Sequence, residues 1–427
     1  MADIKPFKSI YYNSEKVDLK KVVMPPYDII KDKEVEGYYE NDPFNVIRID
    51  KGLAQAGDNP AVNKYTRAAD FMNEWIMDNI LDRDDSESFY VYTQEYKMPD
   101  GKKKEMISFF AAVKIEEYDK RIILPHERTH DGPKADRLEL MRSTYSNTSP
   151  ILAMYPDKEK KIHKVLLERI KKQKPFISFK DLKGIQVKLW KINNDKEIQN
   201  IISMFKNKQL YIADGHHRYE TAMFFRNEMR KKTGVQQTPY DRILMCLISV
   251  EHSNISILPT HRVFKTFRDF DPKSDIMKKY FKVTKLTSPA ALKKVMMKKT
   301  VKKYLGILQN KKAYLLELKQ AIYKKLILKA GHVMEYYMLS PSVLHTLIFD
   351  KLLGVPEKEI FSGITYTQDM DEAINYVMKD GFAVSFLVQP ATTEDVKIIS
   401  QKKEVMPQKS TYFMPKLITG LLINKMN

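Results

Sequence analysis

The feature that most constrains the fold is an apolar run that leads directly into a polar turn and then into a helix. Residues 210–222 have the sequence LYIADGHHRYETA. Residues 210–213 predict a buried strand, Asp214-Gly215 predicts a tight turn, and a helix is expected from about residue 217 to residue 232. The chain must therefore contain both α and β structure.

The same turn carries the most specific chemical signal in the chain. Because the first turn of a helix has unpaired backbone N–H groups and the positive end of the helix dipole, cationic side chains placed there favour binding of an anion. The imidazole and guanidinium groups therefore predict a phosphate site. The simpler alternative is an aspartate cap followed by surface histidines. The predicted phosphate-binding residues are Gly215, His216, His217 and Arg218, and Asp214 is a candidate catalytic residue and metal ligand.

A second polar segment, PHERTHDGPKADR at residues 125–137, contains a letter match to H-E-x-x-H, the zinc-protease helix. We reject that interpretation because Pro125 and the Asp-Gly-Pro at 131–133 leave barely one helical turn between them. As a loop, the segment presents one carboxylate among cations, so Glu127 is the candidate general base. Arg128, Lys134 and Arg137 are its candidate phosphate-binding residues, and His126 and Thr129 its candidate substrate-binding residues.

Three further polar segments could reach the same cleft. ILPTHR at residues 257–262 is a strand that ends in His-Arg, and PPYD at residues 25–28 is a turn before a strand. VMPQKSTYF at residues 405–413 offers an ammonium group, hydroxyls and backbone amides to phosphate oxygens, although it has no Gly-rich loop. Ordinary turn chemistry explains each segment as well. The candidates are His261, Arg262, Lys409, Ser410 and Thr411 for phosphate, and Tyr27 and Asp28 for substrate.

The charge balance has a local origin. The formal net charge is +19, but residues 291–330 alone hold twelve lysines and one acidic residue. This stretch largely lacks the arginines and interleaved aromatic residues of a nucleic-acid surface, so we interpret it as a solvated face. Nucleic acid is therefore not an expected partner.

The 427 residues allow two or three domains. The single cysteine, Cys246, the absence of a signal peptide and the lack of a long apolar run predict a cytoplasmic protein without a membrane span. Because the polar segments are spread along the chain, we expect them to converge on one cleft. The predicted segments are 1–120 (N-terminal α/β), 121–265 (catalytic core), 266–355 (Lys-rich α/β insertion) and 356–427 (C-terminal).

Periodicity predicts the main elements. They are helices at 62–81, 158–172, 343–353 and 370–379, a hairpin at 89–113, and strands at 185–189, 243–250, 255–258 and 382–389.

Several segments taken together resemble one known family over nearly the full length. They are PPYDII, DPFNVIRI, LPHERT, PKADRLELM, SPILAMY, YIADGHHRYETA, ILPTHR, YTQD and MPQKSTYFMPKLITGL. The family is broad and catalogued as a domain of unknown function, and members of it are recognised as free L-serine kinases that use inorganic pyrophosphate. The PHE and DGHHR segments also resemble archaeal ADP-dependent free-serine kinases of the ParB/sulfiredoxin-like superfamily, over residues 122–230.

The resemblance implies an α+β fold with mixed sheets and a ParB/sulfiredoxin-like core, elaborated by N-terminal and C-terminal α/β segments. It implies that Glu127 activates the serine hydroxyl and that residues 214–218 hold phosphoryl groups; His130 departs from the residue expected after H-E-x-T. We expect phosphoryl transfer from pyrophosphate to free L-serine, with Mg²⁺ as cofactor. The alternatives are an ADP- or ATP-dependent serine kinase, a ParB-like nucleic-acid-binding protein and a zinc hydrolase. The oligomeric state stays open.

Overall fold

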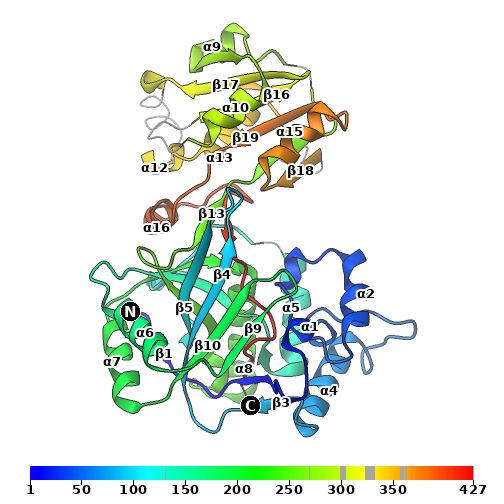
Figure 1. The fold of residues 1–427 in the computed structure, drawn as a ribbon, viewed down its shortest axis with the longest axis vertical. Helices are drawn as coiled ribbons and strands as arrows, with labels where there is room; N and C mark the ends of the chain where they lie inside the picture. Colours follow the sequence, from blue (N-terminus) through cyan, green and yellow to red (C-terminus); the bar gives the residue numbers. More distant parts are fainter. Residues whose placement is uncertain are drawn as a thin grey trace. The chain divides into compact units, whose positions relative to one another are not determined.

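The computed structural model describes residues 1–129, 131–268, 270–298, 304–322, 332–355, 360 and 363–426. These residues divide into two compact units (Figure 1). Unit 1 comprises residues 1–125, 129–255 and 415–427, and unit 2 comprises residues 126–128 and 256–414. Helices pack on sheets in each unit, which confirms the predicted α+β class. The ParB/sulfiredoxin-like core stays a prediction.

The core of unit 1 is a nine-stranded sheet in the order β6-β11-β8-β12-β5-β4-β10-β9, with β1 paired to β5. β11 runs parallel to β6 and β12 runs parallel to β8, whereas the other pairs are antiparallel, so the sheet is mixed. The strands are β1 (Ile4–Lys5), β4 (Phe89–Lys97), β5 (Lys103–Lys114), β6 (Ile123–Leu124), β8 (Ile151–Tyr155), β9 (Ile177–Lys180), β10 (Gln186–Ile192), β11 (Leu210–Asp214) and β12 (Arg242–Ser249).

Three helices cover one face of this sheet. The apolar residues of α6 (Lys161–Lys172), α7 (Asp195–Phe205) and α8 (His216–Thr233) join a single buried cluster with strand residues such as Phe89 and Phe109. Figure 1 shows α6 and α7 beside β1 and β5. Because α8 follows β11 directly, this packing fixes the position of the turn at residues 214–215.

The rest of unit 1 consists of further helices and two short pairs of strands. The helices are α1 (Leu19–Val22), η1 (Tyr27–Ile29), α2 (Asp32–Asn41), α3 (Ile47–Asp50), α4 (Lys64–Met77), η2 (Tyr118–Lys120), α5 (Asp131–Thr144) and η3 (Pro239–Asp241). The paired strands are β2 (Ile10–Tyr12) with β3 (Leu81–Arg83), and β7 (Ser146–Asn147) with β21 (Asn424–Lys425). The pairing of β21 with β7 brings the C-terminal segment back to unit 1.

Unit 2 is built on a six-stranded antiparallel sheet in the order β15-β17-β16-β19-β14-β18. A separate two-stranded sheet joins β13 to β20. The strands are β13 (Ser256–Leu258), β14 (His261–Phe264), β15 (Phe281–Leu286), β16 (Tyr304–Gln309), β17 (Lys312–Leu318), β18 (Ile364–Thr367), β19 (Val384–Val388) and β20 (Tyr412–Met414).

Helices cover this sheet as well. One buried cluster joins Val263 and Leu387 of the sheet to residues of α10 and α15. Phe349 of the π-helix η4 packs against Phe264 and Phe386. The helices of unit 2 are α9 (Asp275–Tyr280), α10 (Pro289–Met296), α12 (Met334–Tyr337), α13 (Ser340–Val343), η4 (Leu344–Leu352), α15 (Met370–Met378) and α16 (Thr393–Gln401).

The units do not follow the four predicted segments. β5, before residue 120, pairs with β12, after it, so residues on both sides of that boundary share one sheet. Residues 415–427 belong to unit 1, whereas the rest of the predicted C-terminal segment belongs to unit 2. Of the residues discussed above, His130 and the Lys-rich stretches 299–303 and 323–331 lie outside the described residues.

Most predicted elements are present, including the hairpin, the helices α4, α6, α8 and α15, and the strands β12 and β19. Helix α5 was not predicted, because its Asp-Gly-Pro start resembles a stop signal and its buried face includes the charged residue Arg137. A proline within the first turn of a helix costs no hydrogen bond. No helix of the described part of the chain has both the length and the apolar character of a membrane span.

Candidate functional site

The Asp-Gly turn of unit 1 holds a tight cluster of ion pairs, which we call the turn cluster (Asp214, Gly215, Arg218 and Lys416). Gly215 has φ +96°, and a Cβ there would lie 2.9 Å from Nε of Arg218. Only glycine therefore suits both the backbone and the close approach of the guanidinium. Helix α8 begins directly afterwards, as the sequence predicted to within one residue.

Both oxygens of the Asp214 carboxylate accept from cations. Arg218 donates from Nη2 to Oδ2 at 2.7 Å, and Lys416 donates from Nζ to Oδ1 at 2.6 Å. Burial raises the pKa of Asp214, but Lys416 and Arg218 lower it by more, so the pKa lies well below its usual range. Asp214 is therefore a carboxylate that aligns two cations.

Arg218 has further partners inside unit 1. Its Nη1 donates to Ser149 Oγ at 3.0 Å and to the carbonyl of Pro150. His216 is buried and His217 is partly exposed at the start of α8. The predicted phosphate residues of this segment thus lie together, with Arg218 anchored from several sides.

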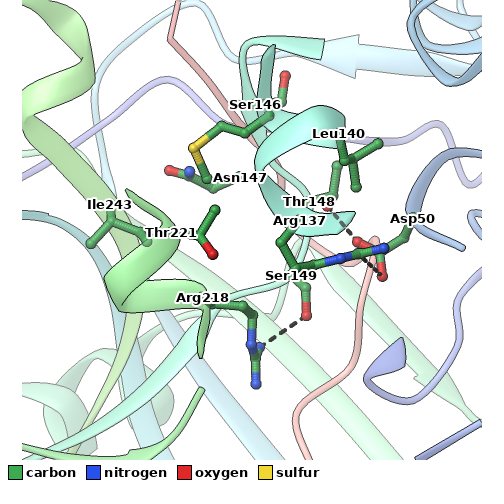
Figure 2. A pocket seen from close by; sticks show the side chains of 11 residues that line it. Asp50, Arg137, Leu140, Ser146, Asn147, Thr148, Ser149, Arg218, Thr221 and Ile243 are labelled. Atoms are coloured by element: carbon green, nitrogen blue, oxygen red, sulfur yellow. Dashed lines mark hydrogen bonds and ion pairs between the residues drawn. The ribbon is translucent and has the colours of Figure 1, made fainter. Parts of the chain in front are cut away.

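A small cavity lies behind this cluster (Figure 2). Its volume of about 30 Å³ admits roughly two water molecules and is too small for pyrophosphate. On one side, Asp50 accepts a hydrogen bond from Thr148, and Arg137 Nη1 lies 3.3 Å from Asp50 Oδ2. The lining residues are Asp50, Arg137, Leu140, Met141, Ser146, Asn147, Thr148, Ser149, Arg218, Thr221 and Ile243.

The other predicted residues of unit 1 have partners of their own. Arg137 also pairs with Asp136 and lies 4.0 Å over the ring of Tyr27, whose pKa burial raises to about 12. Lys134 and Thr129 both donate to Glu220. The neighbour of Tyr27, Asp28, is exposed. Their predicted roles toward phosphate or substrate stay predictions.

Unit 2 contains a second group, which we call the loop cluster (His126, Glu127, Arg262, Lys409 and Thr411). The backbone N–H of Met406 donates to the carbonyl of His126 at 2.8 Å, and His126 Nε2 lies 3.0 Å from Thr411 Oγ1. These bonds hold the segment 126–128 against the loop at residues 406–411. Residues 126–129 are not helical, which confirms the predicted loop and excludes the zinc-protease helix.

Glu127 lies beside the loop at residues 406–411, which the sequence predicted to bind phosphate. Its Oε1 accepts from the backbone N–H of Lys409 at 3.5 Å, the outer limit of a hydrogen bond. Lys409 is exposed and has φ +54°, in the left-handed region, whereas Ser410 donates its hydroxyl to the Pro407 carbonyl. Arg128 is exposed. The loop therefore turns its amide toward a carboxylate.

Arg262 is the most unusual cation of this group. It is 0% exposed, and its guanidinium donates to the backbone carbonyls of Thr260, Gln408 and Lys409. Among the described residues, no carboxylate lies within the 4.0 Å of an ion pair, and its Nε–H has no acceptor. Burial lowers its pKa to about 10, while Tyr366 and Glu127 act in the opposite direction.

Its neighbour His261 faces the other side of β14 and differs from the prediction of a cationic phosphate ligand. The ring is fully buried, and Nδ1 accepts from the backbone N–H of Val388 at 3.2 Å. Burial, with Arg262 nearby, lowers the pKa of His261 to about 3. The imidazole is therefore neutral at neutral pH and carries its proton on Nε2.

Two residues of unit 2 and one of unit 1 were missed as site candidates. Tyr366, opposite Arg262 in the β14–β18 pair, and His345, on η4, each have a buried polar atom without a partner among the described residues. Tyr366 lies within the quoted YTQD segment and Lys416 within the last quoted segment, so the resemblance could have pointed to them. Nothing in the sequence singles out His345.

The described residues do not build a metal site from protein side chains. No group of three or more His, Cys, Asp or Glu side chains in this part of the chain is arranged to hold a metal ion. Asp214, the predicted ligand, would have to release Lys416 or Arg218 before it could bind Mg²⁺. No step below is therefore assigned to the metal.

The structure thus defines an α+β protein with two cation-rich clusters, each of which contains a carboxylate. The chain matches the family model described as "Protein of unknown function (DUF1015)" over residues 4–336. The chain belongs to this family, which confirms the family recognised from its motifs. No curated protein matches the sequence.

Among solved structures, the chain is similar to free serine kinase in complex with AMP, with a TM-score of 0.34, 14% identity, and coverage of 72% of this chain and 87% of that one. A variant of free serine kinase with ADP gives a TM-score of 0.35 at 14% identity and the same coverage. C-terminally truncated SbnI from Staphylococcus aureus gives 0.34 at 11% identity, covering 73% and 85%. Such TM-scores do not establish a common overall fold, so family membership rests on the family match alone.

Proposed function

We propose that the protein is a phosphotransferase that phosphorylates the hydroxyl of free L-serine with inorganic pyrophosphate. The observation that carries this proposal is the loop cluster. In this cluster Glu127 lies beside the Lys409 amide and interacts electrostatically with buried Arg262. A carboxylate held among anion-binding groups suits proton abstraction next to a phosphoryl group. The family motifs quoted above support the same chemistry.

The reaction would proceed by direct transfer. Glu127 accepts the proton of the serine hydroxyl, the serine oxygen forms a bond to one phosphorus of pyrophosphate, and the bridging P–O bond breaks. The products are O-phospho-L-serine and orthophosphate. Phosphoryl transfer depends mainly on positioning and on neutralising the phosphate oxygens, so cations and backbone amides supply most of the catalysis.

Pyrophosphate has no base or ribose, so its affinity must come from cations and amides. The exposed Lys409, with Ser410 and Thr411 of the same loop in unit 2, supplies the proposed contacts. For His216, His217 and Arg218 of unit 1, phosphate binding stays a prediction from the sequence. Mg²⁺ remains part of the proposal, since it would arrive with pyrophosphate and would neutralise part of its charge. The sequence has no nucleotide-binding fingerprint such as a P-loop.

A donor panel tests this function. The purified protein is incubated with Mg²⁺ and L-serine, and separately with pyrophosphate, ADP or ATP, and phosphoserine is measured by mass spectrometry. We expect pyrophosphate to support phosphoserine formation and the nucleotides to fail at equal concentration. Faster phosphoserine formation with ADP than with pyrophosphate would show that the donor assignment is wrong, while the assignment as a serine kinase would stand. Duplex DNA binding with a steep salt dependence, and no phosphoserine, would favour the ParB-like alternative.

A further inference from the structure

The buried guanidinium of Arg262 has no carboxylate within ion-pair distance among the described residues, and Glu127 acts on it only from farther away. A buried ion without a partner is expensive, and natural proteins almost always pair such groups or bind a ligand there. Its acceptors are three backbone carbonyls, which carry no formal charge to balance the guanidinium. The Nε–H has no acceptor within the described residues. An anion would satisfy both the charge and this N–H group.

Two more unsatisfied polar groups are associated with this guanidinium. The antiparallel pairing of β14 with β18 places Tyr366 directly opposite Arg262, and the guanidinium carbon lies 5.7 Å from the Tyr366 ring centroid. His345, on η4, is close enough to Arg262 for its pKa to be lowered by that charge after burial. The Tyr366 hydroxyl and His345 Nε2 are buried without partners in the described part of the chain.

These three groups come from three elements that pack together. His345 stacks edge-on with Phe349 of η4, with ring centroids 5.3 Å apart, and Phe349 contacts Phe386 at 5.0 Å. Phe386 is opposite Arg262 in the β14–β19 pair. The polar groups thus lie at the edge of an apolar aromatic cluster rather than in open solvent.

We propose that Arg262, Tyr366 and His345 form an oxyanion site, and that its occupant is the α-carboxylate of the amino-acid acceptor. The second half of this inference rests on the proposed function. A single buried cation balances one negative charge, which fits a carboxylate. Pyrophosphate carries several charges and would cost far more to desolvate there. Glu127 is close enough to Arg262 to raise the Arg262 pKa, so the proposed base lies near this site.

Equilibrium binding to the full-length Glu127→Gln protein tests the site without turnover. The probes are L-serine, L-serinamide, which lacks the carboxylate, and pyrophosphate. We expect L-serine to bind more tightly than L-serinamide. Arg262→Met should abolish this preference and weaken L-serine binding by roughly 10- to 100-fold, with pyrophosphate changed little. Tyr366→Phe should give a smaller loss of the same kind. Arg262→Lys should restore part of the affinity.

The matched control is Arg268→Met. Arg268 is exposed in the same unit and donates to the carbonyls of Leu353 and Gly354, so its loss should leave serine binding unchanged. A selective loss of pyrophosphate binding in Arg262→Met would overturn the carboxylate and assign the site to the donor. Unchanged binding of all three probes in both Arg262 and Tyr366 variants would overturn the site itself.

Acetate separates this inference from the proposed function. If the site takes a carboxylate, acetate should raise the melting temperature of the wild-type protein and not that of Arg262→Met. This result together with no phosphoserine formation would keep the oxyanion site and reject the serine kinase. No stabilisation by acetate and no preference for L-serine would reject the site, whatever the activity.

Discussion

Arg218 in unit 1 and Arg262 in unit 2 are both buried arginines in predicted phosphate-binding segments, yet their surroundings differ. Arg218 pairs with Asp214, donates to Ser149 and approaches a glycine that makes room for it. Arg262 donates to carbonyls alone and has no carboxylate within ion-pair distance among the described residues. The first is neutralised by an aspartate of its own unit, whereas the second is the proposed binding site of an external anion. Similar motifs therefore have different physical roles.

The largest effect should come from the carboxylate beside Arg262. Glu127→Gln keeps the shape of the side chain and removes its basicity, so turnover should fall by about 10² to 10⁴ with little change in pyrophosphate affinity. Steady-state kinetics of phosphoserine formation measure both. Glu394→Gln is the control, because Glu394 is an exposed carboxylate on α16 paired with Lys397. Near-normal turnover of Glu127→Gln would move the base elsewhere.

The two arginines should respond differently to the loss of charge. Arg218→Met leaves the carboxylate of Asp214 with one cation fewer and should lower the free energy of unfolding by about 3–5 kcal/mol. Arg262→Met removes donors to three carbonyls but also an uncompensated charge, so we expect less than half that cost. Urea unfolding of both variants without ligands measures the difference. An equal or larger cost for Arg262→Met would contradict the contrast.

Acidification should destabilise unit 2 more than unit 1, although burial also lowers the pKa of His163 in unit 1. Burial lowers the pKa of His261 and His345 to about 3 each, below the ordinary 6.5, so the unfolded chain binds more protons between these values. Stability is then lost as pH falls below about 6.5, by about 1.4 kcal/mol per pH unit for each histidine. Asp214, with a lowered carboxyl pKa, costs stability only below its unfolded value of 3.8.

Pulse proteolysis in urea at pH 7 and pH 5, with fragments identified by mass spectrometry, measures each unit. We expect a loss in unit 2 that His345→Gln reduces. An equal loss in unit 1 between these pH values, or no change with His345→Gln, would contradict the assignment of neutral buried histidines.

A smaller change in stability is expected from a substitution in the turn cluster. Gly215→Ala should destabilise the protein by more than the about 1–2 kcal/mol of a left-handed alanine, because its Cβ would also displace the anchored Arg218 guanidinium. Gly184→Ala is matched, since Gly184 has φ +75° and open space around its Cβ position. Thermal unfolding compares them. Equal melting temperatures would show that the approach of Arg218 to residue 215 carries no cost.

Local patterns predicted the strand, turn and helix at residues 210–233, because apolar periodicity and a glycine turn are properties of neighbouring residues. They did not predict which segments share a unit. His126 to Arg128 belong to unit 2, whereas Thr129 belongs to unit 1, because a backbone hydrogen bond from Met406 holds His126. Likewise, Lys416 reaches Asp214 across 202 positions. Such pairings depend on tertiary packing, which one sequence does not display.

The missed residue His345 shows the same limit for burial. Its significance lies in a buried ring nitrogen that is uncharged, lies near Arg262 and has no partner among the described residues. A lone histidine in an apolar helix carries no sign of that in the sequence. Glu127, in contrast, could be placed in a loop from the sequence, because the prolines and polar residues around it excluded a helix.

The most direct test of the central claim is the stoichiometry of the reaction, followed by phosphorus NMR. Purified protein with Mg²⁺, L-serine and pyrophosphate should convert each pyrophosphate into equal amounts of O-phospho-L-serine and orthophosphate, and Glu127→Gln should slow this conversion by at least about 10². Production of orthophosphate alone, or unchanged pyrophosphate in the presence of L-serine, would contradict a pyrophosphate-dependent serine kinase centred on Glu127.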